Sequence, residues 1–266
     1  MREALILRGL AVQPNDWSGR WLYSGFLSQT GRARDAVAQA RLAASLAPFQ
    51  NSRDALAMAQ VLAGQPDDAE ATLAEAKRLW GHDNPELAIA GLEVAAGSVE
   101  PPSPPSRPLA LLDDPAVISA FAGFGISAQV PIWRTCYQAQ FSRDEPRKRA
   151  AVNLLSRAVA DGTIGAANAV SCIAALGDLD GAFRTAQEAF TPAKLGVPAR
   201  MTLLNTEGLF TPSAAPLRRD RRFMALANRL GLVDYWRASG HWPDFCAEPG
   251  LPYDCKAEAA KLARAP

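Results

Sequence analysis

The sequence predicts an all-α fold in which helical hairpins stack side by side as an α-solenoid, closed by a nonrepetitive C-terminal cap. A turn marked by Pro14 recurs 34 residues later at Pro48, which is a typical period for repeats of two helices. The helices between such turns alternate between bulky and small apolar side chains. The chain is also rich in alanine, which favours closely packed helices over other all-α folds.

The first complete unit lies between Pro14 and Pro48. Its first helix is expected over residues 17–29 and carries the bulky side chains Trp21, Leu22, Tyr23, Phe26 and Leu27. Gly31 then supplies the backbone freedom that a tight turn between helices requires. The second helix places small residues on one face, at spacings of four and three, and these are Ala36, Ala40 and Ala43. We therefore expect the two helices to approach closely.

The neighbouring units follow the same pattern. The next unit has Gly64 at its turn and a period of 33 residues between Ala36 and Ala69. Its helices carry Ala57, Met58 and Val61, and then Ala69, Leu73 and Ala76. Upstream, residues 1–12 predict the second helix of a preceding repeat, because Ala4, Leu7 and Leu10 lead directly into the turn. This pattern suggests that upstream sequence is missing.

With these turn and helix residues, the first 90 or so residues of the chain resemble the tetratricopeptide repeat (TPR) family. The resemblance implies a right-handed superhelix in which the first helix of each hairpin lines a concave groove for a protein or peptide. The same pattern returns over residues 168–190, with Ala169, Val170, Ile173, Gly177, Ala182, Ala186 and Ala189. By this register the groove candidates are Trp21, Gly25, Ser28, Gln29, Arg53 and Gln60. Trp21 is also a candidate for the core.

The middle of the chain divides the predicted helices into two blocks. Residues 1–97 form the N-terminal TPR-like block, and residues 85–96 are expected to be its last helix. Residues 98–113 are predicted to be a proline-rich linker, extended up to residue 108, because prolines interrupt helices. A docking motif for a proline-binding domain is the alternative.

The second block is expected over residues 114–208. Helices are predicted over 114–121, 130–141 and 148–158, followed by a pair over 164–190 with its turn at Gly177. Trp133, Tyr137 and Phe141 are four residues apart and therefore share one helical face. We interpret that aromatic face as core packing rather than as a ligand cage.

The cap is predicted over residues 209–266. Its arginine-rich start leads into Arg222-Phe223, Leu230-Gly231-Leu232, Tyr235-Trp236 and Pro243-Asp244-Phe245-Cys246. This block resembles the end of proteobacterial TPR proteins that carry a winged-helix DNA-binding domain or a nucleotide cyclase domain. Neither domain occurs in this chain, so we expect neither direct DNA binding nor cyclase activity. Terminal units of a solenoid must cover an exposed apolar face, and five residues are suited to that role: Leu226, Leu230, Leu232, Tyr235 and Trp236.

The four cysteines fall into two classes. Cys136 and Cys172 lie in apolar helical segments, where a small buried thiol is expected. Cys246 and Cys255 flank a turn-rich segment that can bring their sulfur atoms together. A disulfide there would stabilise the fold by about 2 to 3 kcal/mol. The sequence leaves this disulfide open, because cysteine pairing depends on the compartment.

Composition and motifs limit the function classes. A formal net charge of +1 creates no overall field for nucleic acid or a membrane surface, and no apolar run approaches the roughly 18 residues of a membrane span. His82 and His241 belong to no spaced ligand motif. Arg218, Arg219, Arg221 and Arg222 form the densest basic cluster, in which Asp220 favours surface ion pairing over phosphate binding.

We therefore expect a noncatalytic scaffold that binds a protein or peptide, without a cofactor or metal, as the regulatory part of a bacterial signalling or transcription-control protein. An enzyme with a cleft between the two blocks is one alternative, and a nucleic-acid accessory module that uses the arginine cluster is another. The chain as it stands predicts a cytoplasmic location. A periplasmic location is predicted if it is the C-terminal part of a membrane-anchored regulator.

Overall fold

The described part of the chain is entirely helical. The computed structural model describes residues 2–80, 106–123, 125–190 and 206–262, which form 15 α-helices and three short 3-10 helices and contain no β-strand. The all-α prediction is confirmed to that extent. The expected helix over residues 85–96 lies outside the described residues.

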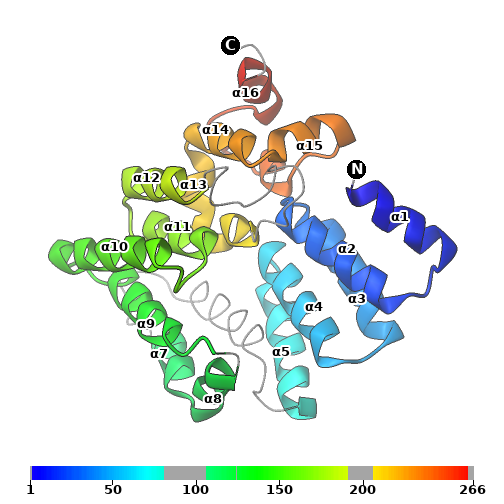
Figure 1. Cartoon of the computed structure of the whole chain (residues 1–266), viewed down its shortest axis with the longest axis horizontal. Coiled ribbons are helices and arrows are strands. Elements are labelled where there is room, and N and C mark those ends of the chain that lie inside the picture. Colours follow the sequence, from blue (N-terminus) through cyan, green and yellow to red (C-terminus); the bar gives the residue numbers. More distant parts are fainter. Residues whose placement is uncertain (1, 81–105, 124, 191–205, 263–266) are drawn as a thin grey trace.

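The N-terminal helices pack in the order in which they occur in the chain (Figure 1). They are α1 (Arg2–Val12), α2 (Trp17–Gln29), α3 (Ala33–Leu46), α4 (Gln50–Leu62) and α5 (Pro66–Trp80). Each one contacts the next, and α2 also contacts α4. Two antiparallel hairpins, α2 with α3 and α4 with α5, therefore lie side by side.

Local sequence explains how the first hairpin forms. The Asp16 carboxylate accepts a hydrogen bond from the backbone N–H of Ser18 at 3.0 Å and so caps α2. Gly31 ends the hairpin turn in the left-handed conformation, with φ at 76°. The small face of α3 is fully buried, since Ala36, Ala40 and Ala43 are all 0% exposed. The predicted packing of small side chains against bulky ones is confirmed here.

A second group of helices follows. It consists of α7 (Ser106–Asp113), α8 (Pro115–Gly123), α9 (Gln129–Gln140), α10 (Glu145–Ala160), α11 (Ala166–Ala175) and α12 (Leu179–Ala189). Trp133, Tyr137 and Phe141 are buried in the core of this group, so their interpretation as packing residues is confirmed.

The predicted linker is wrong over residues 106–113, which include the end of its extended part at residue 108. Residues 98–105 lie outside the described part, but Ser106–Asp113 forms helix α7. Pro108 falls in the first turn, where a missing backbone N–H costs no helical hydrogen bond. Leu112 is fully buried, and Leu109 and Leu111 pack against the same core. Apolar packing therefore decides the helix here, against the proline-rich composition of the preceding residues.

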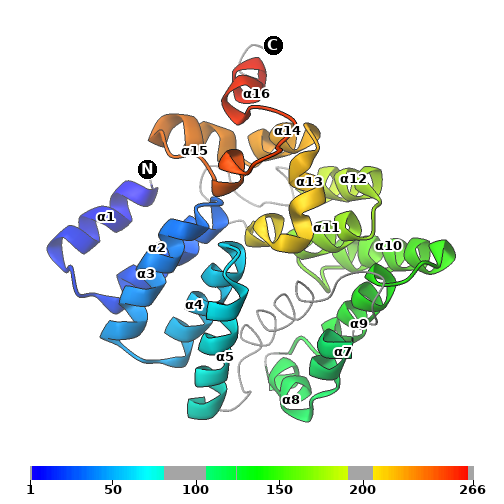
Figure 2. The ribbon, with the colours of Figure 1, turned by 180° about the vertical axis from the view of Figure 1, so that it is seen from behind.

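The C-terminal segment joins the two groups at one end, as both views of the chain show (Figure 1 and Figure 2). It contains η1 (Glu207–Phe210), η2 (Pro212–Ala214), α13 (Ala215–Arg219), α14 (Arg222–Arg229), α15 (Leu232–Ser239), η3 (Asp244–Ala247) and α16 (Cys255–Leu262). The helices α13 and α14 contact α12, whereas η1 contacts both α11 and α2. The cap therefore does more than cover the last hairpin, because it also reaches the first one.

The hairpin turn after α2 is the attachment point of the cap. Three successive backbone carbonyl oxygens, of Gln29, Thr30 and Gly31, accept hydrogen bonds from residues near the C-terminus. Their donors are Thr206 Oγ1 at 2.6 Å, Trp236 Nε1 at 2.9 Å and the backbone N–H of Asp244 at 2.9 Å. Helix C-termini leave such carbonyl groups without partners inside the helix. The cap, together with Thr206 just before it, supplies the missing donors.

A partly buried polar network supports the same attachment. The Arg32 guanidinium lies 2.6 Å from the Glu3 carboxylate and donates to the Tyr235 hydroxyl at 2.8 Å. Tyr23 and Tyr235 both donate to Glu3, at 2.8 and 2.9 Å. Burial alone raises the pKa of Glu3, but the hydrogen bonds from Tyr23, Tyr235 and Arg32 outweigh it and leave that pKa below its usual value. The network holds α1, α2 and α15 together at one point.

Both pairs of cysteines form disulfides. Cys246 and Cys255 are joined with their Cα atoms 5.8 Å apart, which settles the alternative left open by the sequence. The prediction of free buried thiols at Cys136 and Cys172 is wrong, because these residues form a disulfide with a Cα–Cα distance of 6.3 Å. They lie on α9 and α11, which pack against each other, and so residues 36 positions apart in the sequence meet.

Two glycines in equivalent turns provide a test of the attachment. Gly31 and Gly64 both have left-handed backbone conformations, but a Cβ atom at Gly31 would lie 2.6 Å from a ring carbon of Phe210, whereas Gly64 has free space around it. Gly64→Ala should therefore cost only about 1 to 2 kcal/mol of backbone strain. Gly31→Ala should cost at least about 1 kcal/mol more through overpacking against the cap. Urea unfolding followed by circular dichroism measures both losses, and equal losses would contradict the contact.

Candidate functional site

The six groove candidates do not share one environment. Trp21, Gly25, Gln29 and Arg53 are partly exposed on α2 and α4, which contact each other. Ser28 and Gln60 are 4% and 3% exposed, so they belong to the packing between helices. The four partly exposed residues remain the groove candidates.

Two of the six candidates bind to the neighbouring helix of their own hairpin. The Gln60 side-chain oxygen accepts a hydrogen bond from Thr72 Oγ1 at 2.8 Å, which joins α4 to α5. The Arg53 guanidinium lies 3.1 Å from the Glu75 carboxylate across the same pair of helices. A groove ligand would therefore meet an arginine whose charge is already partly balanced.

The arginine cluster of the cap separates into buried and exposed members. Arg218 is 6% exposed, and its guanidinium donates to the backbone carbonyls of Leu209 and Thr211 at 3.1 and 2.7 Å. Burial lowers the pKa of Arg218 to about 10, so the side chain stays charged at neutral pH. Its backbone carbonyl accepts a hydrogen bond from the Tyr253 hydroxyl. The prediction of surface ion pairing is wrong for Arg218, which instead holds the interior of the cap together.

Arg222 forms the ion pairs that the sequence predicted. Its guanidinium lies 2.6 Å from Asp180 on α12 and 2.7 Å from Asp220. The hydrogen bonds from Arg222 hold the pKa of Asp220 below its usual value. The same guanidinium lies 4.5 Å from the centre of the Phe183 ring, within the range of a cation–π contact. Three partners therefore fix the position of this arginine.

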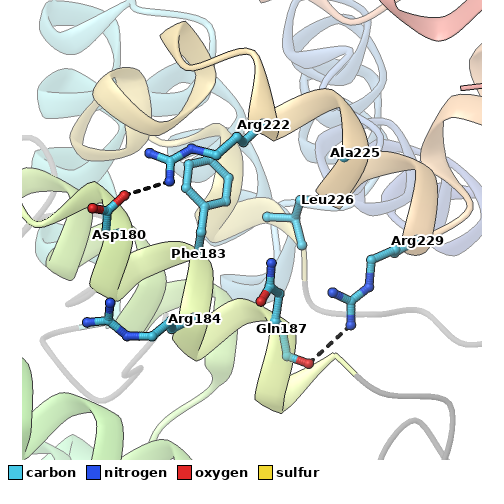
Figure 3. Close-up of a pocket in the computed structure, with 8 residues that line it drawn as sticks. All are labelled: Asp180, Phe183, Arg184, Gln187, Arg222, Ala225, Leu226 and Arg229. Carbon is cyan, nitrogen blue, oxygen red and sulfur yellow. Dashed lines mark hydrogen bonds and ion pairs between the residues drawn. The ribbon is translucent and has the colours of Figure 1, made fainter. Parts of the chain in front are cut away.

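An open pocket lies beside Arg222, between α12 and α14 (Figure 3). Its volume is about 360 Å³, and its lining consists of Asp180, Phe183, Arg184, Gln187, Arg222, Ala225, Leu226 and Arg229. We call it the α12–α14 pocket. Three arginines and one aspartate leave a formal excess of two positive charges in the lining.

The remaining two arginines of the pocket are less constrained than Arg222. Arg229 donates to the backbone carbonyl of Gln187 at 3.1 Å and is exposed. Arg184 is also exposed, and among the described residues its side chain has neither an ion pair nor a hydrogen bond. Each guanidinium carries five N–H donors, so both can still bind an anionic group.

The sequence does not predict this pocket, because its charged residues have spacings that are ordinary for exposed helices. Arg222 and Arg229 are two helical turns apart, a spacing that is ordinary for an exposed helix face. Asp180 and Arg184 are four residues apart, which favours a surface pair within one helix. Only the packing of α12 against α14 brings the charged faces of these two helices together around one pocket.

The described residues contain no group of three or more histidine, cysteine, aspartate or glutamate side chains that could hold a metal ion. Within the same residues, no helix has the length and apolar character needed to cross a membrane. A scan against protein-family models and searches of curated proteins and of solved structures found no match to the chain.

The two neighbouring arginines Arg218 and Arg219 allow a direct test of the buried role. Arg218→Met should destabilise the protein by about 2 kcal/mol, because the buried Leu209 carbonyl loses its charged donor and the Thr211 carbonyl keeps only the N–H of Ala214. Arg219→Met is the matched control at an exposed position and should change stability by less than about 0.5 kcal/mol. The midpoints of urea unfolding measure both effects. Similar midpoints for the two variants would show that Arg218 is not needed in the interior.

Proposed function

We propose that this chain is a noncatalytic scaffold that binds a protein or peptide through its stacked helical hairpins, as the regulatory part of a bacterial signalling or transcription-control protein. The observation that carries the proposal is the packing of α2, α3, α4 and α5 in chain order, with buried small residues on α3. That packing is what a TPR-like solenoid requires, and such folds present long surfaces to extended partners. The step from fold to function is an analogy.

The attachment of the cap adds physical support for binding. A surface that is already ordered loses less conformational entropy when a partner binds. The hydrogen bonds from Thr206, Trp236 and Asp244 to the turn after α2 order the end of the first hairpin. The groove candidates Trp21 and Gly25 lie on that same helix.

The structure weakens the argument for a nucleic-acid module. Arg218 is buried, and Arg222 is paired with two carboxylates, so only two arginines of the cluster, Arg219 and Arg221, remain exposed to neutralise phosphates. We therefore propose protein or peptide binding rather than nucleic-acid binding.

Selection from a library of displayed random peptides tests the proposal. We expect peptides that bind the purified chain with micromolar or tighter affinity, measured by isothermal titration calorimetry, and that slow amide hydrogen exchange in the described helices. Trp21→Ala should weaken peptides that occupy the groove, whereas Leu42→Ala, an exposed position on α3, should not. The absence of any binding peptide, together with turnover of a small-molecule substrate, would favour the enzyme alternative instead.

The disulfides support a further part of the proposal, which is the compartment. All four cysteines are paired, and paired structural cysteines are typical of oxidising compartments. We therefore favour the periplasmic location over the cytoplasmic one.

Thiol labelling in intact native cells tests this location. The cells are denatured in the presence of a high-mass maleimide and without reductant. If all cysteines are paired, the reagent adds no label and the mobility of the chain on a gel is unchanged. After reduction the same reagent should add four labels, one for each cysteine. Labelling before reduction would contradict an oxidising location.

A further inference from the structure

We propose that the α12–α14 pocket binds an acidic peptide segment in extended conformation, with an apolar side chain between two carboxylates. This inference rests on the proposed function, because it names the chemistry of a peptide that the scaffold would recognise. It places that peptide on the outer helix of the hairpin α11–α12 and on the cap, rather than on the groove candidates of α2 and α4.

The charges of the pocket favour an anionic ligand. Asp180 and Asp220 already balance Arg222, but no carboxylate in the described residues pairs with Arg184 or Arg229. Guanidinium groups bind carboxylates through paired, charge-assisted hydrogen bonds. The two free charges come from different helices, so a single ligand that binds both would span the pocket.

The positions of Arg184 and Arg229 favour two carboxylates rather than one. Figure 3 shows Arg184 and Arg229 at opposite ends of the pocket, with Phe183, Gln187 and Leu226 between them. Arg229 is held at the carbonyl of Gln187, which lies about one helical turn beyond Arg184 on α12. One turn rises about 5 Å, and the two side chains then spread apart. On an extended chain, residues at i, i+2 and i+4 point to the same face. Carboxylates four residues apart are then separated by about 13 Å, with an apolar side chain midway between them, which suits arginines that spread apart.

The centre of the pocket favours an apolar group between the charges. Phe183 and Leu226 form its floor with only 5% and 4% of their surface exposed, and exposed Ala225 adds a small apolar surface. The methylene stems of the arginines extend this surface. A simple inorganic anion would leave the floor and most of the 360 Å³ volume unused. A peptide side chain would fill it.

The test uses a fluorescein-labelled hexapeptide with glutamates at its second and sixth positions and a leucine at its fourth, so that all three side chains share one face of the extended chain. Binding to the full chain is followed by fluorescence anisotropy. Arg184→Gln and Arg229→Gln should each weaken binding about tenfold, because each removes a charge-assisted hydrogen bond. Arg184→Lys keeps the charge and should retain part of the affinity. Arg41→Gln, at an exposed position on α3, is the matched control and should bind as the unaltered chain does.

Several results would overturn the inference. The first is that both glutamine variants bind the hexapeptide as tightly as the unaltered chain does. The second is that a hexapeptide with glutamines in place of its glutamates binds the unaltered chain equally well. The third is that inorganic phosphate binds as tightly as the hexapeptide. If peptides selected from the library still bind in these cases, the inference fails and the proposed function stands. If neither the hexapeptide nor any selected peptide binds, both fail.

Discussion

The structure depends on three backbone carbonyl groups at the end of α2. A helix cannot satisfy its own last carbonyls, and here Gln29, Thr30 and Gly31 present theirs in succession. The hydroxyl of Thr206, just before the cap, provides one donor, and the cap provides the other two, from an indole N–H and a backbone N–H. Because a buried carbonyl without a partner is costly, the first hairpin and the C-terminal segment stabilise each other.

The rest of the cap is built to hold these donors in place. Trp236 is fully buried and packs near Phe245, whose ring lies 5.4 Å from that of Phe223. The disulfide between Cys246 and Cys255 closes the segment that follows Asp244, and Arg218 joins the interior carbonyls of the cap. The outer face of α14 is then free to form the α12–α14 pocket. Structural and exposed arginines therefore lie within one short stretch of sequence.

Much of the helical architecture was predictable, because it depends on local patterns. The turn residues Gly31 and Gly64 and the small face of α3 mark the hairpins at spacings that a helix imposes. The helix at Ser106–Asp113 was missed, because its leucines are stabilised by contacts with distant residues. The disulfide between Cys136 and Cys172 was missed for the same reason, since it needs α9 and α11 to meet.

By itself, the sequence determined the helical class and the hairpins of the first block. These follow from the period of side chains along one chain segment, which is a local property. Only the tertiary structure decided that the cap binds the first hairpin and that α12 and α14 share a pocket. It also decided that Arg218 is buried, while Arg184 is exposed and has no ion pair with any described residue. Contacts between residues more than 170 positions apart leave no periodic signal, because each depends on how the whole chain packs.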